Sequence, residues 1–314
     1  MKSIFRWFIP ILCLAVLSNC RRSRASELPK AVPVRADGAL ELRLLSFNVR
    51  YENDGDTDSR AWRQRVIGSV KMLHRQWPDI FGVQEALHGQ AADLWASLPE
   101  YEFFGVGRDD GKRAGEYSGL FYRRDRFEAD AGDCGTFWLS DTPQVPGSRT
   151  WGNEIPRVAA WLHLVDRASG RGFYVFNTHW DHKNQPSRER AAMLISRRID
   201  GRKHTDEPVV LLGDFNSLEV NPGITYLTGK RSSLAGAEQV WQNGLLDTFQ
   251  FLHRDQKNRR TLHFWGGTTD GNVKVDHIMV SRGAEIEDAE IISQDQPMVS
   301  DHFPVFSRVI FPSM

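Results

Sequence analysis

Cysteine is nearly missing from this sequence of 314 residues, which contains only Cys13, Cys20 and Cys134. Cys13 lies in an N-terminal segment that looks like a removable signal and Cys20 stands at the end of that segment, which leaves Cys134 without a disulfide partner in the same chain. A small fold held together by a disulfide network is therefore excluded, even for an exported protein. Stability must come from a hydrophobic core, and 40% hydrophobic residues supply one.

Net charge is also lacking, because 40 lysine and arginine residues balance 40 aspartate and glutamate residues. No long-range positive field attracts a polyanion such as DNA, although a local basic groove is compatible with this balance. The 25% of charged residues is typical of a soluble globular protein. The length alone fits one large domain or two small ones.

Long hydrophobic runs are lacking as well. The apolar segment at residues 8–17 is interrupted by a proline and is too short to span a bilayer comfortably. Lys2 and Arg6 flank it on the N-terminal side, so residues 1–20 are typical of an export signal. The signal ends at Cys20 as in a bacterial lipoprotein, although Asn19 replaces the usual glycine, alanine or serine.

This start predicts where the protein acts. We expect a lipoprotein, anchored to the membrane through a lipid on Cys20 and facing the periplasm or the cell surface, with plain secretion or an uncleaved anchor as alternatives. Residues 21–40 are polar, basic and aperiodic, and are expected to form a flexible tether. The folded domain is expected over residues 41–314, as a monomer.

Several apolar strand patterns end in side chains that bind metals or phosphates. Asn48 follows a strand pattern that starts at residue 41, and Glu85 ends another that starts at residue 79. A third pattern leads into Asp214 and Asn216, which share one face of an extended chain. Each stretch alone also fits a strand that runs into a turn. Together they suit Mg²⁺, which prefers oxygen ligands, at the ends of neighbouring strands.

Two histidine-containing stretches add candidates for proton transfer. His179 and His182 could bind zinc, or His179 could donate a hydrogen bond to a phosphoryl oxygen. The latter is favoured because the other candidate ligands are oxygen donors. Asp301 and His302 precede a final strand, but neighbours on a strand face opposite ways. Asp276, on another strand, is therefore the better partner for the His302 ring, and Asp301 is a better metal or water ligand.

Loops offer further polar and aromatic side chains that could contact a substrate. These candidates are Arg108, Glu116, Arg123, His182, Phe264 and Trp265. Helical patterns are expected near residues 62–77, 91–98 and 186–202. The third is strongly basic, and we interpret its charges as a solvated face.

The strand-end motifs resemble those of one known family. They are Phe47-Asn48, Gln84-Glu85, Thr178-His179, Gly213-Asp214-Phe215-Asn216, Val275-Asp276-His277-Ile278 and Ser300-Asp301-His302. Their order and spacing resemble the endonuclease/exonuclease/phosphatase superfamily over about residues 42–310. The resemblance implies an α/β fold, a four-layer α/β/β/α sandwich of two packed, mixed, mostly antiparallel sheets. It places the active site at one end of the strands.

The resemblance also implies a metal site, with Asn48, Glu85 and Asp301 binding Mg²⁺ or Mn²⁺. Hydrolysis of a phosphate ester needs charge neutralisation, an aligned water and a proton relay, which agrees with such a site. A zinc hydrolase is the alternative chemistry.

The resemblance assigns catalytic roles to five other residues. Asp214 and Asn216 would position the attacking water and the phosphate, and His179 would donate to a phosphoryl oxygen. Asp276 would orient His302, the general base or proton carrier. A histidine beside a carboxylate suits this relay because the carboxylate tunes its pKa.

The sequence therefore predicts a metal-dependent hydrolase of phosphate esters, a phosphodiesterase or phosphatase, that acts outside the cytoplasm. The export signal, the zero net charge and the aromatic loop around Phe264 favour a small or lipid-derived substrate over nucleic acid. A secreted nuclease and a catalytically inactive binding protein on the same scaffold are the alternatives.

Overall fold

The structure, a computed structural model, describes residues 37–294 and 297–313 and contains two six-stranded sheets. In spatial order, the first sheet consists of β13 (Glu285–Ile291), β14 (Val305–Phe311), β1 (Leu40–Asn48), β2 (Ile80–Ala86), β4 (Tyr117–Arg123) and β3 (Tyr101–Phe104). The second consists of β11 (Leu246–Asp247), β12 (Asp276–Val280), β8 (Val209–Asp214), β7 (Gly172–His179), β6 (Val158–Asp166) and β5 (Phe127–Trp138). A separate hairpin pairs β9 (Ser232–Leu234) with β10 (Ala237–Gln239).

Each sheet contains one parallel strand pair joined through a helix. Helix α1 (Trp62–Gln76) connects the parallel strands β1 and β2, and α3 (Gln185–Asp200) connects β7 and β8. The other strand pairs are antiparallel, so the prediction of mixed, mostly antiparallel sheets is confirmed. Because parallel strands end at the same edge, β1 and β2 bring Asn48 and Glu85 together. In the same way, β7 and β8 bring His179 and Asp214 together.

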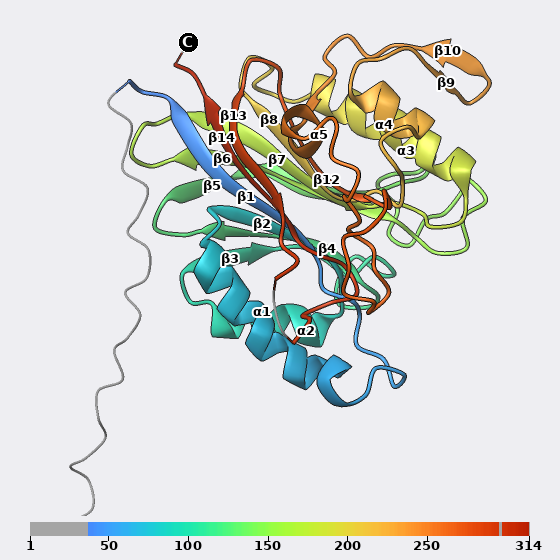
Figure 1. Cartoon of the computed structure of the whole chain (residues 1–314). Coiled ribbons are helices and arrows are strands. Elements are labelled where there is room, and N and C mark those ends of the chain that lie inside the picture. Colours follow the sequence, from blue (N-terminus) through green and yellow to red (C-terminus); the bar gives the residue numbers. More distant parts are fainter. Residues whose placement is uncertain (1–36, 295–296, 314) are drawn as a thin grey trace, which may run out of the picture. The chain divides into compact units, whose positions relative to one another are not determined.

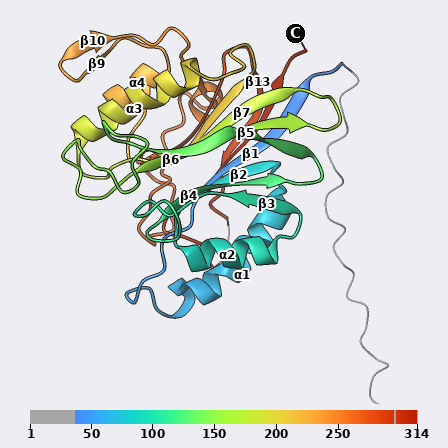
Figure 2. The same cartoon turned by 180° about the vertical axis from the view of Figure 1, so that it is seen from behind.

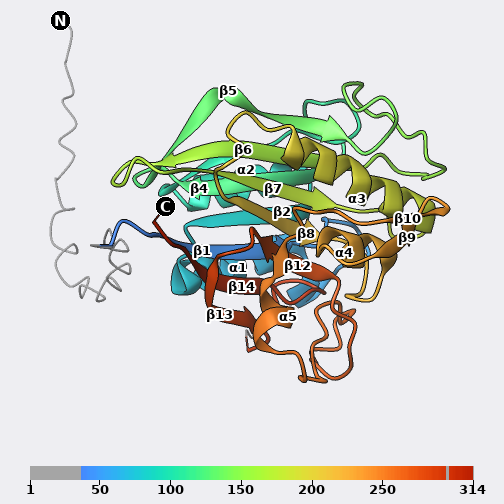
Figure 3. The same ribbon diagram turned by 90° about the horizontal axis from the view of Figure 1, so that it is seen from above.

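Helices cover the outer faces of the two sheets. Helices α1 and α2 (His88–Ser97) lie on one side, and α3 and α4 (Pro222–Leu227) lie on the other, as Figures 1 and 2 show from opposite directions. Figure 3 shows α3 over the second sheet and β5 at its outer edge. A short helix, α5 (Thr248–Leu252), and a 3₁₀ turn, η1 (Asp58–Arg60), complete the elements of the described residues. The predicted four-layer α/β/β/α arrangement is confirmed.

Alternating side chains divide the core into layers. On β8, Val210 and Leu212 belong to the core between the sheets, whereas Val209 and Leu211 belong to the core beneath α3. Strands that are buried on both faces explain why the sequence reads as a continuous apolar run there.

The two sheets approach each other closely at Gly82 of β2. A Cβ atom on Gly82 would lie 2.2 Å from Cδ1 of Leu212 and 2.7 Å from Cγ of Asn177, both on the second sheet. Beside it, Nε2 of Gln84 donates to Oδ1 of Asn177 at 2.7 Å. Nδ2 of Asn177 in turn donates to the carbonyl oxygen of Val83 at 3.0 Å. A buried polar link therefore joins the sheets next to a glycine that allows their contact.

Gly82→Ala is expected to lower the free energy of unfolding by about 1–3 kcal/mol, because the new methyl group overpacks the contact between the sheets. The matched control is Gly89→Ala in α2, where an added Cβ would meet no atom within 4 Å. The control should keep or slightly raise stability, since alanine favours the helix. Urea denaturation measures both; equal midpoints for the two variants would contradict this account of the contact.

Element boundaries differ slightly from those expected. Strand β1 begins at Leu40 and Ala39 is already buried, so the domain starts within the expected tether. Helix α2 begins at His88, before the helix that was expected from residue 91. The predicted signal at residues 1–20, and residues 21–36 of the predicted tether, lie outside the described residues. Within the described ranges, every helix is too short or too polar to serve as a membrane span.

Candidate active site

The polar strand ends of both sheets surround one cavity of about 330 Å³. Its lining residues are Arg50, Tyr51, Glu85, Arg108, Glu116, Ile155, Arg157, His179, His182, Asp214, Asn216, Leu262, Phe264, Asp301 and His302. Two further predicted residues, Asn48 and Asp276, lie just behind this lining and hydrogen-bond to it. Residues from distant parts of the sequence therefore meet here.

Asn48 joins the carboxylates of the two sheets. Its Nδ2 donates to Oε1 of Glu85 and to Oδ2 of Asp214, each at 3.0 Å. The potential ligand atoms of Glu85, Asp214 and His302 all lie within 4.8 Å of one another. This spacing is compatible with a cation bound between the ends of β2 and β8.

Backbone conformations that side chains rarely adopt are concentrated around the cavity. Arg50, Glu85, Asn216 and Phe264 have φ angles of +57°, +62°, +45° and +49°. Glu85 also lies at a register shift between β2 and β4, where a bulge places an extra residue in β2. Such strain is a feature of sites whose side chains must point in set directions.

Asp276 and His302 form the pair that the sequence suggested. Nδ1 of His302 lies 2.9 Å from Oδ2 of Asp276, and both residues are buried. Burial alone would lower the pKa of His302, but the charges of Asp276 and Asp214 outweigh it and raise the pKa to about 10. His302 is therefore an imidazolium at neutral pH when no cation is bound. Its Nε2 lies 3.9 Å from Asp214.

Burial and mutual repulsion both oppose ionisation of the carboxylates in the site. Burial, followed by repulsion from Asp276, raises the pKa of Asp214 to about 7. Burial also raises the pKa of Asp301, and Glu85 adds to that shift. A divalent cation would offset this repulsion, and carboxylate and amide oxygens are the ligands that Mg²⁺ prefers. The donor set therefore fits the predicted Mg²⁺ or Mn²⁺.

His179 is held neutral with a free N–H group. Burial and then the charges of Arg157 and Arg108 lower its pKa well below the usual value. Nδ2 of Asn216 lies 3.0 Å from Nε2 of His179, which must accept this hydrogen bond, so the ring proton is on Nδ1. Nδ1 is buried without a hydrogen-bond partner among the described residues. It is therefore available to donate to a ligand, in agreement with the predicted role.

Arg157 is a site residue that the sequence did not reveal. Its guanidinium is buried, and Nη2 lies 3.1 Å from Nδ1 of His182, whereas Nε and Nη1 have no partner among the described residues. Burial and the neighbouring Arg108 lower the pKa of Arg157, so the surrounding protein disfavours its charge. An unpaired buried cation is a natural contact for an anion. The one signal in the sequence is an arginine, after Pro156, at the head of an apolar strand.

Of the loop candidates, four reach the cavity and two do not. Arg108 and Glu116 pair at 2.5 Å and 2.8 Å and line it with His182, and the exposed Phe264 lies at its edge. Arg123 is not brought to the cavity. It ends β4, pairs with Asp125 and lies over the ring of Trp77. Trp265 does not line the cavity either, because its ring packs against the guanidinium groups of two arginines, Arg60 and Arg65.

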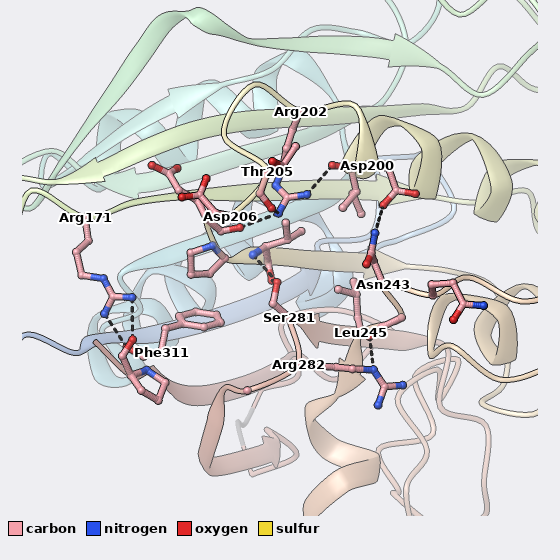
Figure 4. Close-up of a pocket in the computed structure, with 18 of the residues that line it drawn as sticks. Arg171, Asp200, Arg202, Thr205, Asp206, Asn243, Leu245, Ser281, Arg282 and Phe311 are labelled. Carbon is pink, nitrogen blue, oxygen red and sulfur yellow. Dashed lines mark hydrogen bonds between the residues drawn. The ribbon is translucent and has the colours of Figure 1, made fainter. Parts of the chain in front are cut away.

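A larger cavity, of about 530 Å³, lies at the opposite end of the same strands (Figure 4). Its arginines already have partners, since Arg171, Arg202 and Arg282 all donate to backbone carbonyl groups. None of the predicted site residues lines it. Size alone would therefore select the wrong cavity.

Solved structures of bacterial proteins resemble this chain along nearly their whole length. A protein of the endonuclease/exonuclease/phosphatase class from Bacteroides vulgatus is 32% identical, with a TM-score of 0.77, and the match covers 86% of this chain and 98% of that one. A mannosyl-6-phosphatase from Bacteroides thetaiotaomicron is 31% identical, with a TM-score of 0.75, over 86% and 100% of the two chains.

Curated relatives are more distant. Nocturnin from Drosophila melanogaster is 24% identical over 257 residues, which cover 75% of this chain and 37% of the relative. An uncharacterised protein of Acanthamoeba polyphaga mimivirus is 34% identical over 83 residues, which cover 26% of this chain and 30% of that protein. The chain thus spans about a third of the length of the curated relatives it matches.

The family model of the Endonuclease/Exonuclease/phosphatase family matches residues 45–302, a range that runs from β1 to His302. The strand ends, the Asp276–His302 pair and this match lead to one conclusion. The chain belongs to the endonuclease/exonuclease/phosphatase family, whose members hydrolyse phosphate esters.

Proposed function

We propose that this protein is a Mg²⁺- or Mn²⁺-dependent phosphomonoesterase that acts on a small polar phosphate ester such as a sugar phosphate. The observation that carries this proposal is Arg157, which lines the cavity and whose buried Nε and Nη1 have no partner in the described part of the chain. A terminal phosphate has a charge of about −1.5 to −2 at neutral pH, and its oxygens match the fork of an arginine. A diester has one charge fewer and fewer free oxygens to place there.

The size of the cavity supports a small substrate. Its volume of about 330 Å³ lies at the lower end of the usual range for ligand sites, about 300–1,000 Å³. Charged and polar side chains form most of its lining, which suits a polar ligand better than a lipid chain. The similar mannosyl-6-phosphatase, 31% identical, supports the same substrate class.

The protein's own groups perform most of the proposed reaction. Arg157 and the Nδ1–H of His179 bind phosphoryl oxygens and stabilise the charge that develops on them. Asp214 takes a proton from the water as its oxygen bonds to phosphorus, and His302, oriented by Asp276, supplies a proton to the leaving oxygen as the bond from phosphorus to that oxygen breaks. A divalent cation, held by Glu85 with Asn48 and Asp301, would supply further neutralisation of the phosphate charge.

The test is a panel of phosphate esters assayed with Mg²⁺, with Mn²⁺, with Zn²⁺ and with EDTA. We expect metal-dependent release of phosphate, with kcat/KM higher for sugar phosphates than for sphingomyelin, RNA or plasmid DNA. Glu85→Gln should raise the Mg²⁺ concentration needed for half-maximal rate, because it removes one charged ligand. Preference for DNA or RNA would establish a nuclease instead. Absence of turnover across the panel would favour a binding protein, and rescue by Zn²⁺ alone a zinc enzyme.

A further inference from the structure

A second group of metal-binding side chains lies on β5, β6 and the loop between α3 and β8. Potential ligand atoms of Asp133, His163 and His204 lie within 4.8 Å of one another. His163 pairs with Tyr174 on β7, five residues before His179. At about 3.3 Å per strand residue, this group is about 17 Å from the candidate active site along β7. It is therefore separate from the phosphoesterase chemistry.

A large bulge in β5 builds one side of this group. Ala129 pairs with Leu164 and Cys134 pairs with Leu162, so residues 130–133 all lie opposite His163. The bulge brings two carboxylates to that histidine. Asp133 is buried, and Oδ2 of Asp130 lies 3.8 Å from Nδ1 of His163. Bulges of this kind re-aim side chains in a strand that could otherwise pair regularly.

The two ring nitrogens of His163 have the surroundings that are usual for a metal-binding histidine. Its Nε2 lies 2.7 Å from Oε2 of Glu207, whereas its Nδ1 has no hydrogen-bond partner among the described residues. The residue is only 4% exposed, so this free nitrogen is not satisfied by bulk water. A carboxylate on one ring nitrogen that leaves the other free is the usual outer support of a metal ligand.

The carboxylate of Glu207 occupies space that the chain leaves open for it. A Cβ atom on Gly172 would lie 2.3–2.5 Å from the carboxylate atoms of Glu207. Arg202 fixes the same loop by donating to the carbonyl groups of Ile199 at 2.7 Å and Glu207 at 2.9 Å. Figure 4 shows Arg202 beside Thr205 and Asp206 in this loop. Strand β7, through Gly172, and the loop before β8 thus both hold Glu207 in the position from which it supports His163.

His204 and Asp133 complete the donor set. Among the described residues, neither ring nitrogen of His204 has a hydrogen-bond partner, and the ring stacks on His163 with centroids 4.8 Å apart. The hydroxyl of Tyr174 donates to Oδ2 of Asp133 and accepts from the backbone N–H of His204 at 3.2 Å. Tyr174 therefore orients the carboxylate of Asp133 and links it to the backbone of His204.

We propose that Asp133, His163 and His204 bind a Zn²⁺ ion that fastens the edge strand β5 to the loop between α3 and β8. Two imidazoles and a carboxylate are typical zinc ligands, and Asp130 is close enough to supply a fourth after a small movement. Ligand atoms in a tetrahedral site lie about 3.3 Å apart, so the group contracts modestly when it binds. The ion links residues 133 and 204 and so closes a long loop. Cys134, the cysteine within the described residues, is free and forms no disulfide.

The experiment uses the full chain, stripped of metal and then kept in excess Mg²⁺ so that the active site is supplied. Zn²⁺ is titrated by calorimetry, and Co²⁺ is titrated in parallel because its visible spectrum reports tetrahedral coordination. We expect the wild type to bind one equivalent of Zn²⁺, and the His204→Asn and Asp133→Asn variants not to bind it. Zinc at about a hundredfold the Kd should raise Tm by about 5 °C in the wild type and not in these variants.

The matched control is His88→Asn, a substitution of an exposed histidine on α2. This variant should still bind one equivalent of Zn²⁺ and show the same rise in Tm. His204 is only partly buried and Asp133→Asn keeps an oxygen for Tyr174, so both variants should fold and retain wild-type kcat with Mg²⁺. The proposal is overturned if the wild type binds no Zn²⁺ in excess Mg²⁺, or if both variants still bind the same number of ions with unchanged affinity.

Discussion

Replacement of His302 by glutamine is expected to lower kcat by about 10²- to 10⁴-fold, the usual contribution of a general acid or base. Glutamine can still donate to Asp276, so this carboxylate is not left buried and unpaired, as it would be in an alanine variant. The loss should appear in kcat more than in KM, because a proton relay acts on the transition state. Steady-state kinetics with saturating Mg²⁺ measure it.

His88→Gln, on α2 and outside the lining of the cavity, serves as the control and should retain wild-type kcat. A thermal melt confirms that the His302 variant is folded, since His302 is buried and its loss could otherwise act through stability. If His302→Gln kept a kcat within about threefold of the wild type, well below the expected 10², the relay would have to be assigned to another group.

Arg157→Met is expected to lower kcat/KM for phosphate monoesters by about 10²- to 10³-fold, the cost of removing one preorganised donor from a developing charge. Methionine preserves much of the buried side-chain volume but removes the charge. A diester has fewer free phosphoryl oxygens, so its slower hydrolysis should be affected less. Rates for p-nitrophenyl phosphate and bis-p-nitrophenyl phosphate provide this comparison.

Arg123→Met is the matched control, because it removes a buried arginine that pairs with Asp125 outside the cavity. This control should retain kcat/KM and show at most a loss of stability. An equal loss on monoester and diester in Arg157→Met would mean that Arg157 supports the fold of the site and does not select the monoester.

Strand ends were predictable from the sequence because a buried strand is an apolar run, and the polar residue that ends it stands out. Asn48, Glu85 and Asp214 were found in this way, and the structure places all three around one cavity. The Asp276–His302 pair followed from the opposite orientation of neighbouring residues in a strand. The layers followed from the resemblance to a known family.

Other features depend on tertiary contacts that no local pattern records. Arg157 looks like an ordinary residue after a proline, and only its burial beside Arg108 reveals an unpaired cation. Arg123 looks like a loop residue, but it packs over Trp77. The bulge in β5 was equally hidden, because residues 127–138 read as one strand, and only the partner strand shows four residues opposite His163.

The hydrogen bond between Gln84 and Asn177 joins two sheets that each contribute part of the candidate active site. The first sheet holds Asn48 and Glu85, and the second holds His179, Asp214 and Asp276, so neither sheet alone contains a complete set of reactive groups. Catalysis therefore begins only when the two sheets have docked in the correct alignment. We expect a nascent or damaged chain with only one sheet formed to have no catalytic activity. Turnover would then report that both sheets of the sandwich are assembled.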